Sequence, residues 1–125
     1  MIGGNKMKVN AKSIDLAKVQ AEAEESYRKG FFCCEAVMEV IMDNFELDVP
    51  HEIIKMASGM AIGVGKSGCI CGALNGGVLA ISMFFGRDEQ RGPKDPEVVK
   101  CMSMTNELHD WFRENNTKKA ACCRV

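Results

Sequence analysis

The sequence predicts an all-α fold, a compact bundle of about five to six helices around a buried, glycine-rich central helix. Apolar residues recur at the spacing of amphipathic helices, and no run alternates apolar and polar residues as strands do. Segments 48–50 and 95–97 each place an aspartate before a proline, which is typical of a helix start. We expect residues 1–125 to form a single domain, with residues 1–12 as a loose polar lead-in.

The first two helices are predicted from their caps and apolar faces. The first follows Ser13, a residue type favoured at the N-cap, and ends before Gly30. The second extends from Cys33 to about Asn44. The residues expected to face inward on these two helices are Leu16, Val19, Ala23, Tyr27, Ala36, Val37, Val40 and Ile41.

The middle of the chain predicts a third helix, a tight loop and the central helix. The third helix begins near Pro50 and ends near Ala61. Glycines are too dense over 59–68 for a regular helix, so this segment is interpreted as a helix end and a loop. Residues 69–85 are apolar or small on all sides, which predicts a buried helix that Gly86 ends.

The last long helix is predicted from Asp95 to about Asn115, after a polar surface connection over 87–94. Residues 117–125 are expected to begin another helix. The inward face of the long helix is predicted to carry Val98, Cys101, Thr105, Leu108 and Phe112, and Trp111 is expected to help Phe112 close the core.

Composition excludes several function classes. The net charge of −1 gives no basic surface for nucleic acid. The N-terminus lacks a signal sequence, and the longest apolar stretch is too short and too interrupted by glycines for a membrane span. We therefore expect a cytoplasmic protein. The GxGxxG string at 63–68 follows a helical pattern rather than a strand, and Met60 stands where a P-loop needs glycine, so neither phosphate motif is present.

Seven cysteines in 125 residues are the main chemical feature. An odd number in a reducing cytosol argues against a disulfide framework and for buried, metal-bound or redox-active thiols. Cys33 and the pair Cys69 and Cys71 follow glycine breaks at helix starts, where backbone N–H groups favour thiolate. Together with Cys123 they are the stronger candidates. Cys101 is interpreted as a core residue, and Cys34 and Cys122 as companions in adjacent pairs, since neighbouring helical side chains diverge by about 100°.

The glycines of the central helix, Gly72 and Gly76, each cost about 1 kcal/mol relative to alanine. They are explained either by close packing of a neighbouring backbone or by close approach of a bulky inorganic group. His51 and His109, the only histidines, are interpreted as surface residues. Without an E-x-x-H pattern, a di-iron carboxylate site is excluded.

Three segments resemble one known family. Residues 71–76 (CGALNG) are similar to the C-G-A-x-x-G motif of the C_GCAxxG_C_C family of redox-active proteins, residues 33–37 (CCEAV) to its C-A-Q-A-V element, and residues 123–124 to its C-R element. The resemblance covers about residues 15 to 125 and extends to the non-haem part of split-Soret cytochromes, which carry an iron–sulfur cluster. No C-x-x-C-H is present here, so no c-type haem is expected.

The resemblance implies a redox or electron-transfer protein that binds an iron–sulfur cluster through Cys33, Cys71 and Cys123. The family has a further cysteine after the C-R element, where this chain ends. Either Cys69 or another thiol takes that fourth place, or the chain is truncated and its last helix is incomplete. The supporting glycines of the site are Gly68, Gly72 and Gly76.

Two alternatives remain open at the level of sequence. One is a metal-free thiol–disulfide protein or sensor in which Cys33 or Cys71 forms a disulfide with a neighbour. The other is a helical interaction module with core cysteines. No base is paired with a nucleophile, so no enzyme activity is assigned. A redox partner protein of unknown identity is implied, and exposed apolar surface favours a homodimer.

Overall fold

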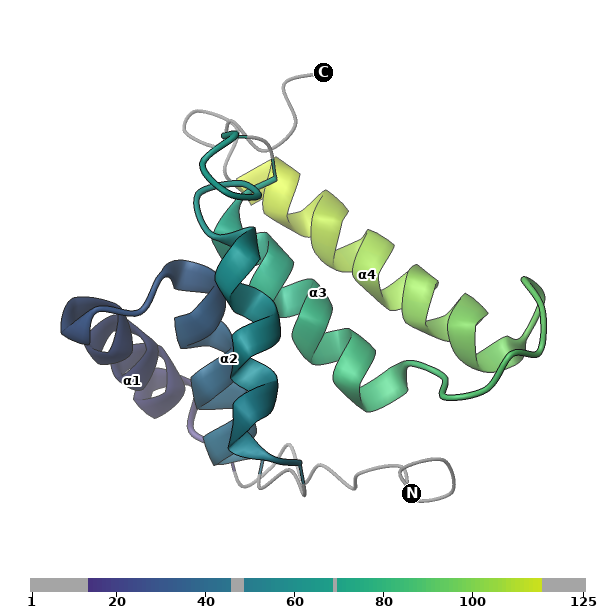
Figure 1. Ribbon diagram of the computed structural model, residues 1–125, viewed down its shortest axis with the longest axis horizontal. Coiled ribbons are helices and arrows are strands. Elements are labelled where there is room, and N and C mark those ends of the chain that lie inside the picture. Colours follow the sequence, from purple (N-terminus) through teal and green to yellow (C-terminus); the bar gives the residue numbers. More distant parts are fainter. Residues whose placement is uncertain (1–13, 46–48, 69, 116–125) are drawn as a thin grey trace.

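Helices form all the regular structure of the residues described in the computed structural model, which are 14–45, 49–68 and 70–115 (Figure 1). Their order is α1 (Leu16–Lys29), α2 (Cys33–Asn44), η2 (His51–Met60), α3 (Gly72–Phe85) and α4 (Pro96–Asn115). The all-α prediction is confirmed. The assignment of residues 1–125 to one domain stays a prediction. The lead-in at 1–12 and the helix expected at 117–125 lie outside the described residues.

Local capping sets the ends of α1. The carboxylate of Asp15 accepts hydrogen bonds from the backbone N–H groups of Ala17 and Lys18, at 3.0 and 3.3 Å. This corrects the predicted cap, because Ser13 lies outside the described residues and the helix begins after Asp15. Gly30 ends the helix with φ of 124°, a conformation that glycine adopts at no steric cost, as predicted.

The start of α4 depends on Asp95, a buried carboxylate. It accepts the backbone N–H of Glu97 at 2.9 Å and Nε of Arg91 at 2.6 Å. The hydrogen bond from Glu97, and then the one from Arg91, hold the pKa of Asp95 below its usual value. The predicted cap and the predicted end near Asn115 are both confirmed.

The helices form a row in which α2 and α3 are parallel neighbours (Figure 1). Their N-termini meet at Cys33 and Gly72, and their C-terminal ends meet where the Phe45 and Phe84 rings lie 5.5 Å apart. α1 packs on α2, while η2 runs back along α2 and also contacts α3. The row therefore places two helix N-termini at one end of the molecule.

α4 packs against α3 in the opposite direction. Near its start, the ammonium of Lys100 lies 5.0 Å from the centre of the Phe85 ring, at the end of α3. Further along, a Leu108 methyl group lies beside Gly77, close to the start of α3. α4 therefore ends at the same end of the molecule at which α2 and α3 begin.

α3 is the central helix, as predicted: Gly72, Leu74, Gly76 and Ala80 are buried, and its other residues are partly buried. Its glycines explain how its neighbours approach so closely. A Cβ on Gly76 would lie 2.9 Å from the carbonyl oxygen of Cys34 and 2.9 Å from Cβ of Val37, and one on Gly77 would lie 2.8 Å from Leu108. Real Cβ atoms do not approach this closely, so close packing accounts for these glycines.

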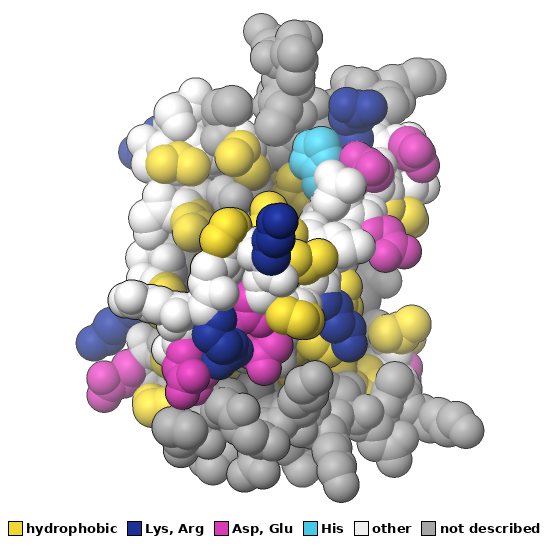
Figure 2. Space-filling view, turned by 90° about the vertical axis from the view of Figure 1, so that its right-hand side faces the viewer, with side chains coloured by type: hydrophobic (Ala, Val, Ile, Leu, Met, Phe, Trp, Pro, Cys, Tyr) yellow, Lys and Arg dark blue, Asp and Glu magenta, His cyan; other side chains and the backbone are white. Residues whose placement is uncertain are grey.

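Three of the side chains expected to face inward are exposed instead. Leu16 and Tyr27 lie near the two ends of α1. The face of α1 that meets α2 instead carries Ser26, which donates a hydrogen bond to Glu39, and Glu22, which accepts one from Asn44. Trp111 is exposed, and among the described helices α4 packs only on α3. Figure 2, which views the α4 side, shows apolar side chains interspersed with charged ones. The homodimer stays a prediction.

The third predicted helix is a 3₁₀-helix rather than an α-helix. With three residues per turn, side chains three apart lie on one face. Ile54 and Ala57 accordingly are buried, and Met60 is partly buried against the same cluster. The apolar spacing in this segment thus follows a period of three.

The loop after η2 contains a left-handed run. Residues 62–66 all have positive φ, and Ile62 and Val64 adopt it although their side chains are β-branched. Hydrogen bonds from Gly65 N to Gly59 O, at 2.9 Å, and from Gly68 N to Ile62 O, at 3.1 Å, hold the run closed. The predicted glycine-rich loop is confirmed, and it leads directly into α3.

None of the helices in the described ranges combines the length and the apolar character needed to cross a membrane. The expectation that the protein binds no membrane stays a prediction. The cytoplasmic location stays a prediction.

We predict that Gly76→Ala lowers the free energy of unfolding by about 1–3 kcal/mol, because the new methyl group overlaps the backbone of α2. Urea denaturation measures this. Gly59→Ala is the control, since nothing lies within 4 Å of its added Cβ. Equal stability of the two variants would contradict the close approach of α2 and α3.

We predict that Val64→Asn raises the free energy of unfolding by about 1 kcal/mol, because asparagine tolerates the left-handed conformation that valine resists. The matched control is Val99→Asn in α4, since the two valines are 54% and 50% exposed. Thermal and urea denaturation should show a gain for the first and a loss for the second, and a loss for both would contradict the left-handed assignment.

Candidate functional site

Two of the four predicted ligand cysteines lie at the shared N-terminal end of α2 and α3. Cys33 is the first residue of α2 and is exposed, while Cys71 is the N-cap of α3 and is partly buried. The two helices touch at this point, because a Cβ on Gly72 would lie 3.8 Å from Cβ of Cys33. Sequence reasoning placed both cysteines at helix starts, and the structure adds that the two starts are adjacent.

The electrostatic character of this end comes from the backbone. In an α-helix the first N–H groups have no intrahelical acceptor, and the N-terminus carries a partial positive charge. At the start of α3, the side chain of the N-cap residue Cys71 makes no capping hydrogen bond. Two parallel N-termini side by side also repel each other weakly. Both effects favour the binding of an anionic group at this end.

Glu35 fixes the start of α2 beside Cys33. One of its carboxylate oxygens accepts the backbone N–H of Phe32 at 3.1 Å, and the other accepts the hydroxyl of Ser58 at 3.0 Å. The carboxylate thus joins the first turn of α2 to η2. It fixes the backbone next to Cys33, and its two hydrogen bonds go to Phe32 and Ser58 rather than to the Cys33 thiol.

Cys34 is buried, whereas its neighbour Cys33 is exposed. It is 0% exposed, and its thiol donates a hydrogen bond to the carbonyl oxygen of Ala57 at 3.1 Å. Burial raises the pKa of this thiol, and the negative charges of nearby groups add to the effect. Its interpretation as a companion of Cys33 agrees with this position in the core.

The other interpreted residues lie away from this end or at the surface. Cys101 is buried, as predicted, with its sulfur 3.9 Å from the hydroxyl of Ser82. His51 is exposed, and His109 pairs with Asp110 at 3.2 Å at the surface of α4. The prediction that the histidines are surface residues is confirmed for His51. His109 is partly exposed, which agrees with the same prediction.

The remaining candidate ligands, Cys69 and Cys123, lie outside the described residues, as does Cys122. Of the supporting glycines, Gly72 and Gly76 contact α2, and Gly68 has φ of 73° in the loop before Cys71. Within the described part of the chain, no group of three or more His, Cys, Asp or Glu side chains is arranged to hold a metal ion. The structure therefore brings together two of the predicted ligands.

Asn75 is a site residue that sequence reasoning did not single out. Its side-chain nitrogen is buried, and it has no hydrogen-bond partner among the described residues. Asn75 follows Cys71 by one helical turn, and its backbone N–H donates to the Cys71 carbonyl at 3.0 Å. The available signal was a lone carboxamide within a helix of small and apolar residues.

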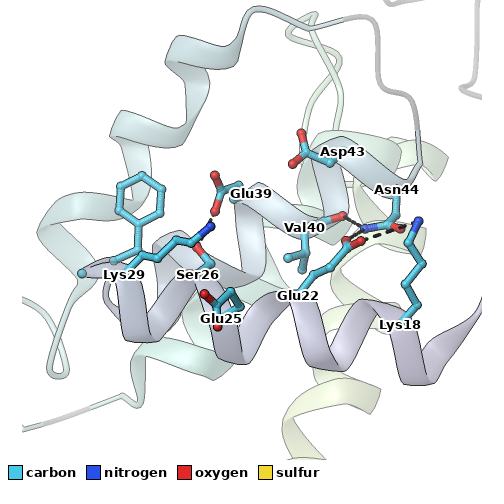
Figure 3. A pocket seen from close by; sticks show the side chains of 11 residues that line it. Lys18, Glu22, Glu25, Ser26, Lys29, Glu39, Val40, Asp43 and Asn44 are labelled. Atoms are coloured by element: carbon cyan, nitrogen blue, oxygen red, sulfur yellow. Dashed lines mark hydrogen bonds and ion pairs between the residues drawn. The ribbon is translucent and has the colours of Figure 1, made fainter.

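A polar groove of about 650 Å³ lies elsewhere, between α1 and α2 (Figure 3). Its lining side chains largely satisfy one another: Ser26 donates to Glu39, and Asn44 donates to Glu22 at 2.7 Å. No cysteine lines the groove. It is the polar seam between two helices and is separate from the thiols.

We predict that Cys34 makes stability fall in alkaline solution. Its pKa is raised on folding, so its contribution is present below the unfolded value near 9 and is lost as the pH rises through the folded value. Above the unfolded pKa of the thiol, the free energy of unfolding of the wild type should fall with pH more steeply than that of Cys34→Ala, by at most about 1.4 kcal/mol per pH unit. Urea denaturation from pH 7 to 10.5 measures it. Cys101→Ala controls for lost packing, and parallel curves for wild type and Cys34→Ala would refute the prediction.

Comparison with known proteins gives one match. No curated protein and no solved structure matches the chain. Residues 31–125 match the family described as "Putative redox-active protein (C_GCAxxG_C_C)", and the matched range includes Cys33, Cys71 and all of α2, η2, α3 and α4. The chain therefore belongs to the C_GCAxxG_C_C family of redox-active proteins.

Proposed function

We propose that this protein transfers electrons through an iron–sulfur cluster held at the shared N-terminal end of α2 and α3. The observation that carries the proposal is the closeness of the starts of α2 and α3, where a Cβ added to Gly72 would lie 3.8 Å from Cβ of Cys33. Two family-motif cysteines on two different helices therefore lie at one end of the molecule. Membership of the redox-active family supports the redox role. The cluster and the ligand set are the proposed part.

The chemistry of the donors suits an iron–sulfur cluster. Cysteine thiolate is the usual ligand of such clusters, and four are required in the common types. Cys33 and Cys71 supply two. Cys69 precedes Cys71 by two residues and Cys123 follows the end of α4 by eight residues. Eight residues span at most about 29 Å, and α4 ends near the site, so Cys123 is within reach.

The surroundings also suit an anionic group with sulfur atoms. The backbone N–H groups in the first turn of α3, to which the Cys71 side chain makes no capping hydrogen bond, and the buried side-chain nitrogen of Asn75, which has no acceptor among the described residues, are hydrogen-bond donors. A bound cluster belongs over the helix ends rather than over the glycine stripe, because α2 already covers Gly72 and Gly76. When bound, the cluster supplies one-electron transfer, and the protein supplies ligands, donors and burial.

A metal-free dithiol is a second candidate, favoured by the exposure of Cys33 and the absence of a three-ligand metal group within the described residues. Here one thiolate attacks the disulfide of a partner protein, forming a mixed disulfide and releasing one partner thiolate. The second cysteine then displaces the other. Two electrons and two protons move in total, leaving a Cys33–Cys71 disulfide and a reduced partner.

We predict that protein purified anaerobically and reconstituted with iron and sulfide is brown and retains both elements after desalting. Cys33→Ala and Cys71→Ala should lose most of the iron, because each removes a ligand. Cys101→Ala is the matched control, because this buried cysteine lies beside Ser82, away from the N-terminal ends of α2 and α3. The Cys101→Ala variant should keep the iron. Iron and sulfide analysis and visible absorbance give the result.

The same preparation distinguishes the candidates. If the protein holds no iron and loses two thiols on mild oxidation, and mass spectrometry maps a Cys33–Cys71 disulfide, the result would contradict the cluster and support the dithiol. Protein that neither retains iron nor forms that disulfide would contradict both and leave a helical interaction module.

A further inference from the structure

The loop between η2 and α3 combines backbone strain with little packing. Ile62, Val64 and Lys66 have φ of 51°, 56° and 70°, in the left-handed region that residues with a side chain avoid. The side chains of Ile62 and Val64 are 49% and 54% exposed, so about half of each faces solvent and makes no contact that would offset the strain. Strained residues persist only where other interactions hold them.

Hydrogen bonds within the loop provide that hold. The Ser67 hydroxyl donates to the carbonyl oxygens of Gly63 and of Val64, the latter at 2.7 Å. The backbone N–H groups of Gly65 and Gly68 donate to carbonyl groups six residues earlier in the chain. None of these bonds goes to α2 or α4, so they close the loop on itself and on the end of η2.

We propose that residues 61–68 form a clasp with two states. In the closed state, which the structure shows, the left-handed run is intact. In the open state the hydrogen bonds of the Ser67 hydroxyl are broken and the strained residues return to the right-handed or extended region, while the helices stay folded. Backbone strain favours opening and few contacts oppose it, so opening costs less free energy than global unfolding.

The clasp lies directly before the start of α3. Gly68 precedes Cys71, the N-cap of α3, by three residues. An open clasp leaves the start of α3 free to move relative to Cys33, whereas the closed clasp keeps the two cysteines at one end of the molecule. This consequence rests on the proposed function. Any group bound by both cysteines would favour the closed state, because it binds that state more tightly.

Trypsin cleavage after Lys66 measures the open state, because a protease needs an extended substrate segment and the closed run is left-handed. In reduced, metal-free protein, cleavage after Lys66 should be at least about tenfold faster than cleavage after Lys100, which lies within α4. Early peptide mapping gives both rates. Each is divided by the rate for a synthetic peptide of the same local sequence, which removes differences in intrinsic susceptibility.

Two substitutions should move the normalised rate at Lys66 in opposite directions. Val64→Asn should lower it about fivefold, because asparagine tolerates the left-handed conformation of the closed state. Ser67→Ala should raise it about fivefold, because the hydroxyl that holds the run is lost. Ser103→Ala, at an exposed position of α4, is the control and should leave the rate unchanged. Ile62→Asn replaces Val64→Asn if that variant does not fold.

A separate measurement tests the link to the cysteines. Protein that has been loaded with iron and sulfide should be cleaved after Lys66 about tenfold more slowly than metal-free protein, because binding at Cys33 and Cys71 favours the closed clasp. If no preparation holds iron, the cluster proposal fails, while the variants of the metal-free protein still decide whether the clasp exists.

Two results would overturn the clasp. One is an equal normalised rate after Lys66 and after Lys100 with the same dependence on urea, which would show that cleavage requires global unfolding. The other is a folded Val64→Asn or Ser67→Ala variant whose rate is unchanged or moves in the opposite direction. An equal rate at Lys66 in iron-loaded and metal-free protein would overturn the link to the cysteines.

Discussion

The close approach of α2 and α3 at Gly72 and Gly76 is the constraint on which the rest of the structure depends. Any larger residue at Gly76 would collide with the backbone of α2, so the two helices can approach this closely only because Gly76 lacks a side chain, while Gly72 lies in ordinary van der Waals contact range. The contact makes the helices parallel neighbours and brings their N-termini together. The position of Cys33 beside the start of α3 follows from it.

This arrangement has an electrostatic consequence. Parallel helices place their partial positive charges side by side, which is unfavourable unless an anion lies at that end. The two helices carry the motif cysteines Cys33 and Cys71 at this end. The packing that stabilises the bundle and the chemistry of the family motif therefore depend on the same glycines. The buried thiol of Cys34, hydrogen-bonded to Ala57, belongs to the packing side of this arrangement.

Sequence patterns predicted helix boundaries well where the signals are local. Gly30 ends α1 and Asp95 caps α4, because both effects act within one turn of the chain. The inward faces were predicted less well. Leu16, Tyr27 and Trp111 are exposed, since the rotation of a helix on the outside of a bundle depends on its partner rather than on its own period. Likewise, the apolar spacing did not distinguish the 3₁₀-helix from an α-helix.

The sequence by itself determined the helical class, the cysteines at helix starts and the family, because capping, glycine breaks and motif spacing are local properties. Only the tertiary structure decided which helix starts are neighbours, which of the adjacent cysteines Cys33 and Cys34 is exposed, and that Asn75 has a buried donor. Those features depend on contacts between helices that are far apart in the chain. The closest of these contacts requires the absence of a side chain at Gly76. The sequence does not reveal that the helix packed against Gly76 is α2.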